Sequence, residues 1–438
     1  MAKLAPAAAA SLKAYIDAAV SDPSGAPGVV VVAVNKLGEP IFEHAAGKIG
    51  LGKTDMISMD SVFWIASCTK MITGIACMQL VEQGRLALDD SDQVYKLAPE
   101  LKEKRVWDNG KLVPKTSEIT LRMLLTHTAG FGYSFFDPRL SDWAGPLGLD
   151  EFSGSFHDYL SQPLVNQPGK TWEYGISLDW AGVLAERVSG LRLNDYFQEN
   201  IFKPMGISDI SMVPTEDMKA RLAYMHLRSA NGELRLHPNG HVNRRPLYAS
   251  TEAEKASTFH SGGAGCFARP SDYAQVITLL LNNGTHPRTG TQILKKETVE
   301  EMFTNQIPEM PNFGRGEAVP PPKRDLINPV LEVYPGDGDS PQGWGLSFFL
   351  HLHDSGTGLH SKGTAWWAGL PNLYWWADRQ RGFGGIVASQ ILPSSDAKML
   401  DLWAGIEAGL IQQVVATDGI QNDASANTGG VLNVQEIN

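Results

Sequence analysis

Residues 62–84 read VFWIASCTKMITGIACMQLVEQG, and this stretch decides how the rest of the chain is interpreted. Apolar residues recur at helical spacing as far as Val81, and Gly84 is a typical residue to end a helix. The pattern predicts a helix that begins at Ser67 and runs to Glu82. The apolar run at 62–65 is too short for a helix of its own, so we expect it to be buried chain that leads into this one.

The serine and the lysine of this stretch are spaced for chemistry. A serine at the start of a helix has free backbone N–H groups beside its hydroxyl. Lys70 lies one turn after Ser67 on the same face, which brings its amine within reach of that hydroxyl. A desolvated lysine has a lowered pKa and can take the serine proton. An N-cap serine and a solvated lysine would have the same spacing, so the motif alone leaves both interpretations open.

Composition limits the classes of protein to consider. The chain has 438 residues, enough for two or three domain-sized units, and its hydrophobic fraction of 43% is ordinary for a globular protein. Its net charge of −11 argues against nucleic acid or an anionic membrane as the main partner.

The cysteines and the first residues indicate a compartment. The three cysteines leave one unpaired in any disulfide pattern and form no metal-binding motif. Lys13 and Asp17 interrupt the alanine-rich start, which therefore lacks the apolar core of a signal peptide, and no stretch approaches the roughly 20 apolar residues that span a bilayer. We expect a cytoplasmic protein without disulfides, with no membrane or nucleic acid among its partners.

The order of the elements predicts a discontinuous α/β (α+β) architecture. Helices are predicted at 7–20, 119–127, 178–189, 193–202, 271–282 and 397–414, and strands at 28–35, 40–46, 345–353, 373–377 and 383–389. The strands come from both ends of the chain and the middle shows no strand pairs. We therefore expect a sheet domain from 1–92 and 258–415 that encloses a mostly helical domain at 93–257. The proline-rich segment 306–341 is expected to be an irregular, lid-like insertion, and 416–438 a polar tail.

Three other features have ordinary structural explanations. The glycine-rich run 261–267 lacks the ending of a phosphate-binding loop and indicates close approach of two backbones. His127, at the end of a predicted helix, could be catalytic, but a structural role is the commoner one there. His351 and His353 form an H-x-H pair without a nearby carboxylate cluster, so no metal site is expected.

Three motifs in order resemble one enzyme family. Ser67-x-x-Lys70 is followed by ITLRMLLTHTAG at 119–130 and by PGKTWEY, which ends at Tyr174. The chain resembles the serine-dependent penicillin-recognising family: class C β-lactamases, DD-peptidases, family VIII carboxylesterases and fungal lovastatin-type acyltransferases. The resemblance covers roughly 25–410. It implies a class C β-lactamase fold, with an antiparallel sheet flanked by helices and a helical insertion, and Ser67, Lys70 and Tyr174 as catalytic residues.

The departures from the family pattern narrow the activity. β-Lactamases carry Tyr-x-Asn where this chain has Tyr174-Gly175-Ile176, with Ser177 one place later. They carry Lys-Thr-Gly as a third motif, where this chain has Trp367-Ala368-Gly369, a form found in the esterases and acyltransferases. The tempting Lys362-Gly363-Thr364 precedes that position. Because the groups that bind the amide and the carboxylate of a β-lactam antibiotic are missing, β-lactam hydrolysis is not expected as the main activity.

The resemblance also implies a mechanism. Ser67 would attack an ester carbonyl while Lys70 and Tyr174 handle the proton, and either could be the first base. The backbone N–H groups of Ser67 and Leu370 would form the oxyanion hole. The residues expected to contact the substrate are Trp367, Gly369, Ser177, Tyr133, Phe136 and Trp172. For the aromatic side chains among them, packing in the core is the alternative.

The sequence therefore predicts a cofactor-free and metal-free ester hydrolase acting on a bulky apolar or polyketide-like small molecule. Acyl transfer to a secondary-metabolite alcohol, possible with a thioester acyl donor, is the alternative. Two further alternatives remain. The protein could have β-lactamase or DD-peptidase activity, or it could be a non-catalytic binding protein on the same scaffold.

Overall fold

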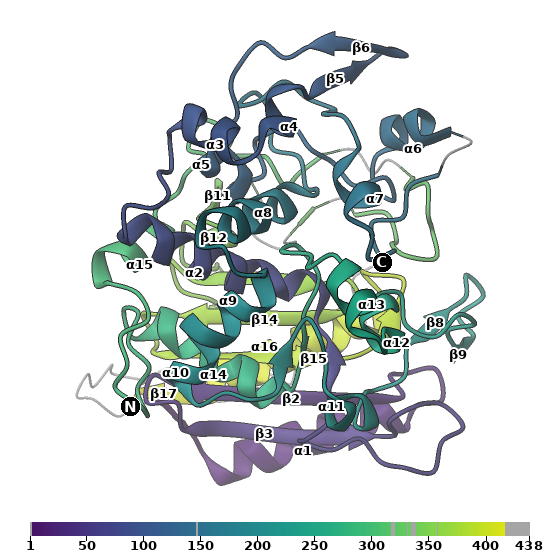
Figure 1. Cartoon of the computed structure of the whole chain (residues 1–438). Helices are drawn as coiled ribbons and strands as arrows, with labels where there is room; N and C mark the ends of the chain where they lie inside the picture. The colour runs from purple at the N-terminus through teal and green to yellow at the C-terminus, as the bar shows by residue number, and fades with distance from the viewer. Residues whose placement is uncertain are drawn as a thin grey trace.

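A seven-stranded antiparallel sheet extends from the bottom of the molecule in Figure 1 to just above its middle. The structure is a computed structural model, and it describes residues 2–145, 148–316, 320–330, 332–333, 339–356 and 358–416. The strands, in spatial order, are β11 (Gln342–Trp344), β12 (Phe349–His351), β13 (Ala365–Gly369), β14 (Leu373–Asp378), β15 (Phe383–Ala388), β2 (Gly28–Asn35) and β3 (Pro40–Gly47). The pairing of β2 with β15 joins the two ends of the chain, as the sequence pattern predicts.

Both faces of this sheet are covered by helices. Tyr374 stacks on Trp403 of α16 (Ala397–Gln413), whereas the next residue, Trp375, contacts Tyr273 of α14 (Pro270–Leu281). Because successive residues of a strand point to opposite faces, α16 and α14 lie on opposite sides. α1 (Pro6–Ser21) packs beside α16. All eight residues of β2 are buried, which explains why it is a nearly continuous run of valines.

Helix α2 (Thr69–Glu82) lies between the sheet and the helices above it (Figure 1). It packs against α8 (Ser177–Ser189), and its residues from Thr69 to Leu80 are buried on every side. A single 3₁₀ turn, Ala66–Cys68, precedes it, so the predicted helix begins at Ser67 with a tighter turn than an α-helix.

The part of the chain between 93 and 257 holds most of the upper half of Figure 1. Its helices are α4 (Pro99–Lys102), α5 (Leu121–Leu125), α6 (Pro138–Ala144), α7 (Phe156–Leu160), α8, α9 (Leu193–Phe197), α10 (Lys203–Met205), α11 (Glu216–Ala220), α12 (Arg245–Tyr248) and α13 (Glu252–Ser257). α3 (Ser91–Leu97) precedes them. A π-helical turn, Gln198–Phe202, continues α9 and completes the predicted helix at 193–202.

The expectation that this section lacks strand pairs is wrong. β5 (Arg105–Asp108) pairs with β6 (Lys111–Pro114), and β8 (His226–Arg228) pairs with β9 (Leu234–Leu236). Each strand has three or four residues, many of them polar, so none shows a recognisable alternation of apolar and polar residues. The division into domains remains a prediction.

Two further predicted elements differ from the structure. The strand expected at 345–353 is shorter in the structure: residues 345–348 form the turn of a hairpin between β11 and β12, with Ser347 at a φ of +86°, and only 349–351 are strand. Its continuous apolar sequence hides the turn. The predicted strands do not include β13, because the sequence identifies its WWAG run only as the third family motif. α5 ends at Leu125, before His127 adopts a left-handed φ of +57°.

Smaller strand pairs complete the fold. β10 (Phe267–Ala268) joins β4 (Phe63–Trp64) to β7 (Ile210–Ser211), and β16 (Ile391–Leu392) pairs with β8. β1 (Ala2–Leu4) pairs with β17 (Val414–Ala416), so Ala416 belongs to a strand, and the rest of the predicted tail, 417–438, lies outside the described residues. α15 (Lys296–Met302) leads into segment 306–341, whose described residues form neither a helix nor a strand.

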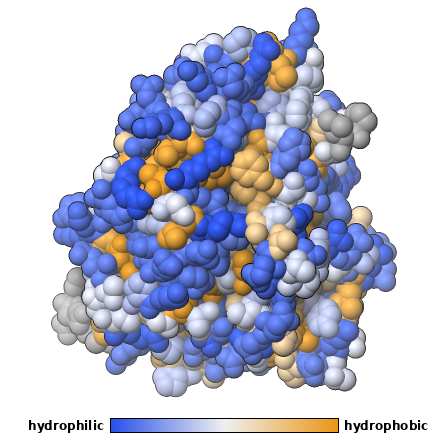
Figure 2. Space-filling view, viewed as in Figure 1, coloured by the Kyte–Doolittle hydropathy of each residue, from blue (hydrophilic) through white to orange (hydrophobic). Residues whose placement is uncertain are grey.

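No described helix is both long and apolar enough to cross a membrane. The face drawn in Figure 2 carries its apolar residues in separate patches among polar ones. Cys68, Cys77 and Cys266 are free, buried thiols.

Candidate active site

Ser67 lies at an opening in an otherwise buried stretch. From Ser61 to Leu80 every residue is buried except Ser67, which is partly exposed. Ala66 precedes it with a φ of +43°, a conformation that residues with a side chain rarely adopt. The turn thus presents a single hydroxyl from the core to a cavity that Ala66 and Ser67 both line.

The Lys70 amine is completely buried beneath this hydroxyl. Its Nζ donates hydrogen bonds to Ser67 Oγ at 2.9 Å, to the Gly263 carbonyl at 3.0 Å and to Tyr133 Oη at 3.2 Å. An ammonium has three protons, so these acceptors satisfy it fully. Burial lowers the pKa of Lys70, and the Asp179 carboxylate opposes that shift. A lysine with a lowered pKa can exchange a proton with the serine.

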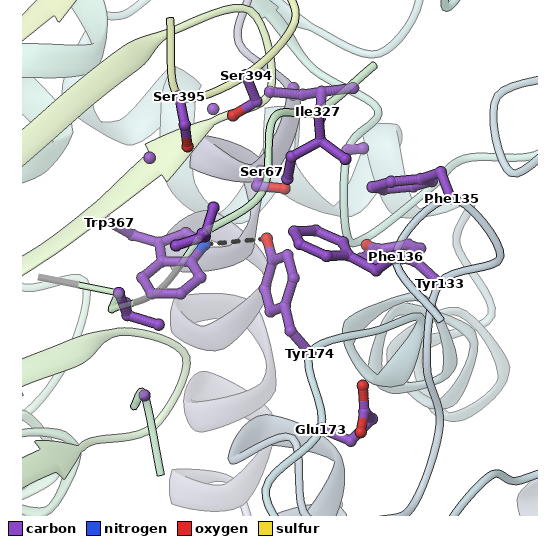
Figure 3. Close-up of a pocket in the computed structure, with 18 of the residues that line it drawn as sticks. Ser67, Tyr133, Phe135, Phe136, Glu173, Tyr174, Ile327, Trp367, Ser394 and Ser395 are labelled. Carbon is purple, nitrogen blue, oxygen red and sulfur yellow. Dashed lines mark hydrogen bonds between the residues drawn. The ribbon is translucent and has the colours of Figure 1, made fainter. Parts of the chain in front are cut away.

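Tyr174 comes from the other side of the cavity. Its hydroxyl accepts a hydrogen bond of 2.9 Å from Trp367 Nε1, and Lys70 Nζ lies 4.5 Å from the centroid of its ring. Figure 3 shows the hydroxyls of Ser67 and Tyr174 turned toward one another. Burial raises the pKa of Tyr174, while hydrogen bonds with Ser67 and Trp367 lower it. The structure therefore brings together the three residues predicted to be catalytic.

His127 holds the chain on both sides of Tyr174. Its carbonyl accepts a hydrogen bond of 2.8 Å from the Glu173 N–H, and its Nδ1 accepts one of 3.4 Å from the Gly175 N–H. Its ring packs 4.8 Å from that of Tyr174, between the ring centroids. Burial lowers the pKa of His127, so the imidazole is neutral. These contacts agree with the structural role favoured for this histidine.

The end of β13 packs against the turn that carries Ser67. A Cβ atom on Gly369 would lie 2.6 Å from the Ile65 carbonyl oxygen, so only glycine allows this approach. Leu370 follows and lines the same cavity as Ser67. The backbone N–H groups of Ser67 and Leu370 remain the predicted oxyanion hole.

The cavity has a volume of about 380 Å³ and mostly apolar walls. Five of the predicted substrate contacts line it: Tyr133, Phe136, Trp172, Trp367 and Gly369. Figure 3 shows several of these aromatic side chains around Ser67. Phe135 also lines the cavity, and further walls that the sequence did not identify come from Phe152, Phe313, Ile327, Val330 and Val333. The last four belong to segment 306–341, which therefore forms part of the wall.

Three predicted contacts have other surroundings than expected. Ser177 is buried at the first position of α8 and is not among the residues that line the cavity, because the helix turns its side chain into the core. Tyr133 and Trp367 line the cavity, but each also makes a hydrogen bond to a predicted catalytic residue, Lys70 and Tyr174 respectively. The sequence gives no local sign of either bond because the partners are far apart in the chain.

Glu173 is a wall residue that the sequence analysis missed. Its Oε2 accepts hydrogen bonds from Asn166 Nδ2 at 3.1 Å and, weakly, from Arg139 at 3.5 Å. Burial and the nearby Asp137 raise the pKa of Glu173 to about 7. The only available signal was its place directly before Tyr174.

The remaining candidates lie elsewhere. Lys362 is exposed on the turn before β13 and does not line the cavity, so it does not supply the cation of the family's third motif. His351 packs against His360, with 3.3 Å between ring centroids. Among the described residues, no group of three or more His, Cys, Asp or Glu side chains is placed to hold a metal ion.

Relatives of known activity resemble the chain over most of its length. It is 33% identical to lovastatin esterase of Penicillium rubens over 392 residues, which cover 86% of this chain and 92% of the esterase. It is 31% identical to monacolin J acid methylbutanoyltransferase of Aspergillus terreus over 411 residues, which cover 88% and 92%.

Solved structures share the fold. Simvastatin synthase (LovD) from Aspergillus terreus superposes with a TM-score of 0.75 at 28% identity, covering 95% of this chain and 100% of that one. The model of the family described as Beta-lactamase matches residues 16–408. Because this match spans most of the chain and the relatives are esterases and acyltransferases, the protein is a serine enzyme of the beta-lactamase family, in its group of carboxylesterases and lovastatin-type acyltransferases.

Proposed function

We propose that the protein is a carboxylic ester hydrolase that works through an acyl-enzyme on Ser67. The observation that carries the proposal is the 2.9 Å hydrogen bond between Lys70 Nζ and Ser67 Oγ at the wall of an aromatic cavity. That contact joins a nucleophile to a base whose pKa is lowered by burial, and the cavity gives an ester access to both.

The first half of the reaction forms the acyl-enzyme. Ser67 Oγ attacks the carbonyl carbon, and its proton passes to the coupled pair of Lys70 and Tyr174. The carbonyl oxygen becomes an oxyanion, which the N–H groups of Ser67 and Leu370 would stabilise. When the intermediate collapses, the C–O bond to the alcohol breaks and the departing alkoxide takes the proton back.

The second half releases the acid. A water molecule attacks the acyl carbon, gives one proton to the same pair, and displaces Ser67 Oγ, which regains a proton. Trp367 and His127 hold Tyr174 in place throughout, one through its hydroxyl and the other through the backbone on both sides.

We propose a bulky apolar or polyketide-like ester as the substrate. The walls are aromatic and aliphatic side chains around a space of about 380 Å³, which suits a ligand with a large apolar body. The names of the relatives, a lovastatin esterase and a monacolin J acid methylbutanoyltransferase, support the polyketide-like class.

Acyl transfer is the second candidate. An acyl-enzyme reacts with water or with an acceptor alcohol, and both outcomes need the same three catalytic residues. The similarity to the methylbutanoyltransferase favours this alternative, in which a small-molecule thioester would deliver the acyl group. We rank hydrolysis first because water is always present.

One experiment separates the two activities. The enzyme is incubated with an activated acyl thioester and a series of alcohols, and the amounts of ester and free acid formed are measured. Free acid in excess supports hydrolysis, whereas ester in excess makes the enzyme an acyltransferase. The Ser67→Ala variant should form neither product, with a loss of several orders of magnitude; full activity in this variant would overturn both proposals.

The proposal includes the remaining expectations on partners and location. We propose a small-molecule ester as the partner, no role for nucleic acid or a membrane, and a cytoplasmic location. The net charge of −11 and the three free cysteines support this assignment.

A further inference from the structure

A buried carboxylate that the proposed mechanism does not use lies behind Lys70. Asp179, the third residue of α8, has no exposed surface. Its Oδ1 accepts hydrogen bonds from Ser261 Oγ at 2.5 Å and from the Gly263 N–H at 3.2 Å. Its Oδ2 is buried and has no hydrogen-bond partner. A carboxylate in this position is costly unless a nearby positive charge compensates it.

The backbone of Gly263 links this carboxylate to Lys70. The N–H of Gly263 donates to Asp179, and its carbonyl accepts the 3.0 Å hydrogen bond from Lys70 Nζ. A Cβ atom on Gly263 would lie 2.6 Å from Asp179 Oδ2, and one on Gly262 would lie 2.5 Å from the Leu178 carbonyl oxygen. The glycines of the run 261–265 are therefore needed for the loop to lie against α8.

The other titratable groups around the pair are neutral at neutral pH. Lys70 is faced by the phenols of Tyr133 and Tyr174, the thiol of Cys68 and the imidazole of His127. Burial raises the pKa of both phenols and of the thiol, and lowers the pKa of the imidazole.

Asp179 is faced by Lys70, by Tyr133 and by the phenol of Tyr159, whose pKa burial also raises. Ser261 and Gly263 complete its surroundings as uncharged hydrogen-bond donors. Among these groups, the Lys70 amine and the Asp179 carboxylate are the two that carry charge. Each favours the charged form of the other, against the effect of burial.

We propose that Asp179 is a positioning residue for Lys70. Its carboxylate holds the Gly263 carbonyl where that oxygen accepts a hydrogen bond from the amine. Its negative charge keeps Lys70 protonated to a higher pH than burial alone would allow. Asp179 thereby sets the pH range in which the amine and the Ser67 hydroxyl exchange a proton.

The Asp179→Asn variant tests this role. Asparagine keeps an oxygen that can accept from Ser261 and Gly263, but it removes the charge. Without the charge the ammonium is less stable, so the pKa of Lys70 falls. Whichever limb of the pH profile of kcat/KM reports Lys70 should move to lower pH, by about 1 to 3 units. A shifted acidic limb would identify neutral Lys70 as the base, and a shifted alkaline limb would show that its ammonium form is needed.

A second readout does not depend on ester turnover. The rate at which a serine-directed phosphonate labels Ser67 is measured against pH in the wild type and in Asp179→Asn. This inference rests on the proposed function only in the pH profile of kcat/KM, because that assay requires the enzyme to hydrolyse an ester. If the wild type is labelled but hydrolyses no ester, the proposed function fails while this test still stands.

The control is Glu151→Gln, which also removes a buried carboxylate from this part of the molecule. Glu151 accepts hydrogen bonds from the backbone and hydroxyl of Ser134 and, unlike Asp179, is not among the groups that raise the pKa of Lys70. Its pH profile should stay in place. If Asp179→Asn lowers activity without moving either limb, or moves one to higher pH, the proposal is wrong. Should this variant not fold, the smaller Asp179→Ser is measured in the same way, with the same two outcomes.

Discussion

Replacing Trp367 with phenylalanine removes one hydrogen bond from the proposed catalytic tyrosine and leaves most of the packing. Trp367 Nε1 donates to Tyr174 Oη at 2.9 Å, and its ring packs against Tyr174 and Trp344, with centroids 5.1 Å and 4.7 Å away. Phenylalanine retains an aromatic ring at this position and has no donor.

The size of the effect follows from the charge that Tyr174 acquires. An N–H donor stabilises a phenolate more than a phenol, and a hydrogen bond to a charged group contributes about 1.5–3 kcal/mol. If the phenolate takes part in the rate-determining step, kcat/KM should fall about 10- to 150-fold, since about 1.36 kcal/mol corresponds to a factor of ten. The bond also lowers the pKa of Tyr174, so its loss should move the limb that reports this phenol up by about 1–2 units.

The assay is the pH profile of kcat/KM with an activated aryl ester. The matched control is Trp344→Phe, because Trp344 Nε1 donates to the Leu125 carbonyl instead of Tyr174 and the ring belongs to the same aromatic cluster. An unchanged profile in Trp367→Phe, or an equal change in both variants, would show that the hydrogen bond from Trp367 does not stabilise the phenolate of Tyr174.

Three further changes test other parts of the account. Gly369→Ala places a Cβ 2.6 Å from the Ile65 carbonyl oxygen, so β13 must shift. The value of kcat should fall more than about 10-fold while KM changes less. An unaltered kcat would contradict the proposed oxyanion hole. Glu173→Gln removes a carboxyl whose pKa rises to about 7 on folding, so the folded wild type loses stability as pH rises from about 4.5 to 7. The melting temperature of the variant should therefore increase relative to that of the wild type across this pH window. A constant difference between the two melting temperatures would be inconsistent with the raised pKa. Trp403→Ala removes a side chain stacked on two aromatic rings of the sheet and should lower the free energy of unfolding by about 3–5 kcal/mol, measured by urea denaturation, with a loss below 1 kcal/mol as the contrary result.

The sequence predicted those parts of the site that depend on local spacing. Ser67 and Lys70 are three residues apart at the start of one helix, so their contact follows from helix geometry. Tyr174 comes from a distant segment, and only the family resemblance connected it with them. The strands β2 and β3 could be predicted equally well from the sequence, because valine runs and a short turn define them locally.

The parts that were missed depend on contacts between distant segments. Tyr133 was expected to contact substrate, and nothing near it in the sequence indicates the hydrogen bond with Lys70. Ser177 was expected in the cavity because it follows the tyrosine motif, but it begins α8, whose side chains here are buried. Phe313 lies in an irregular segment without periodicity, so its place in the wall could not be predicted.

Covalent labelling shows whether Ser67 is the nucleophile. The protein is treated with a serine-directed phosphonate, digested, and analysed by mass spectrometry. We expect one adduct, on Ser67, formed much more slowly in a Lys70→Met variant because the serine then has no neighbouring amine. An adduct on another residue, no adduct, or equal labelling of the variant would contradict this expectation.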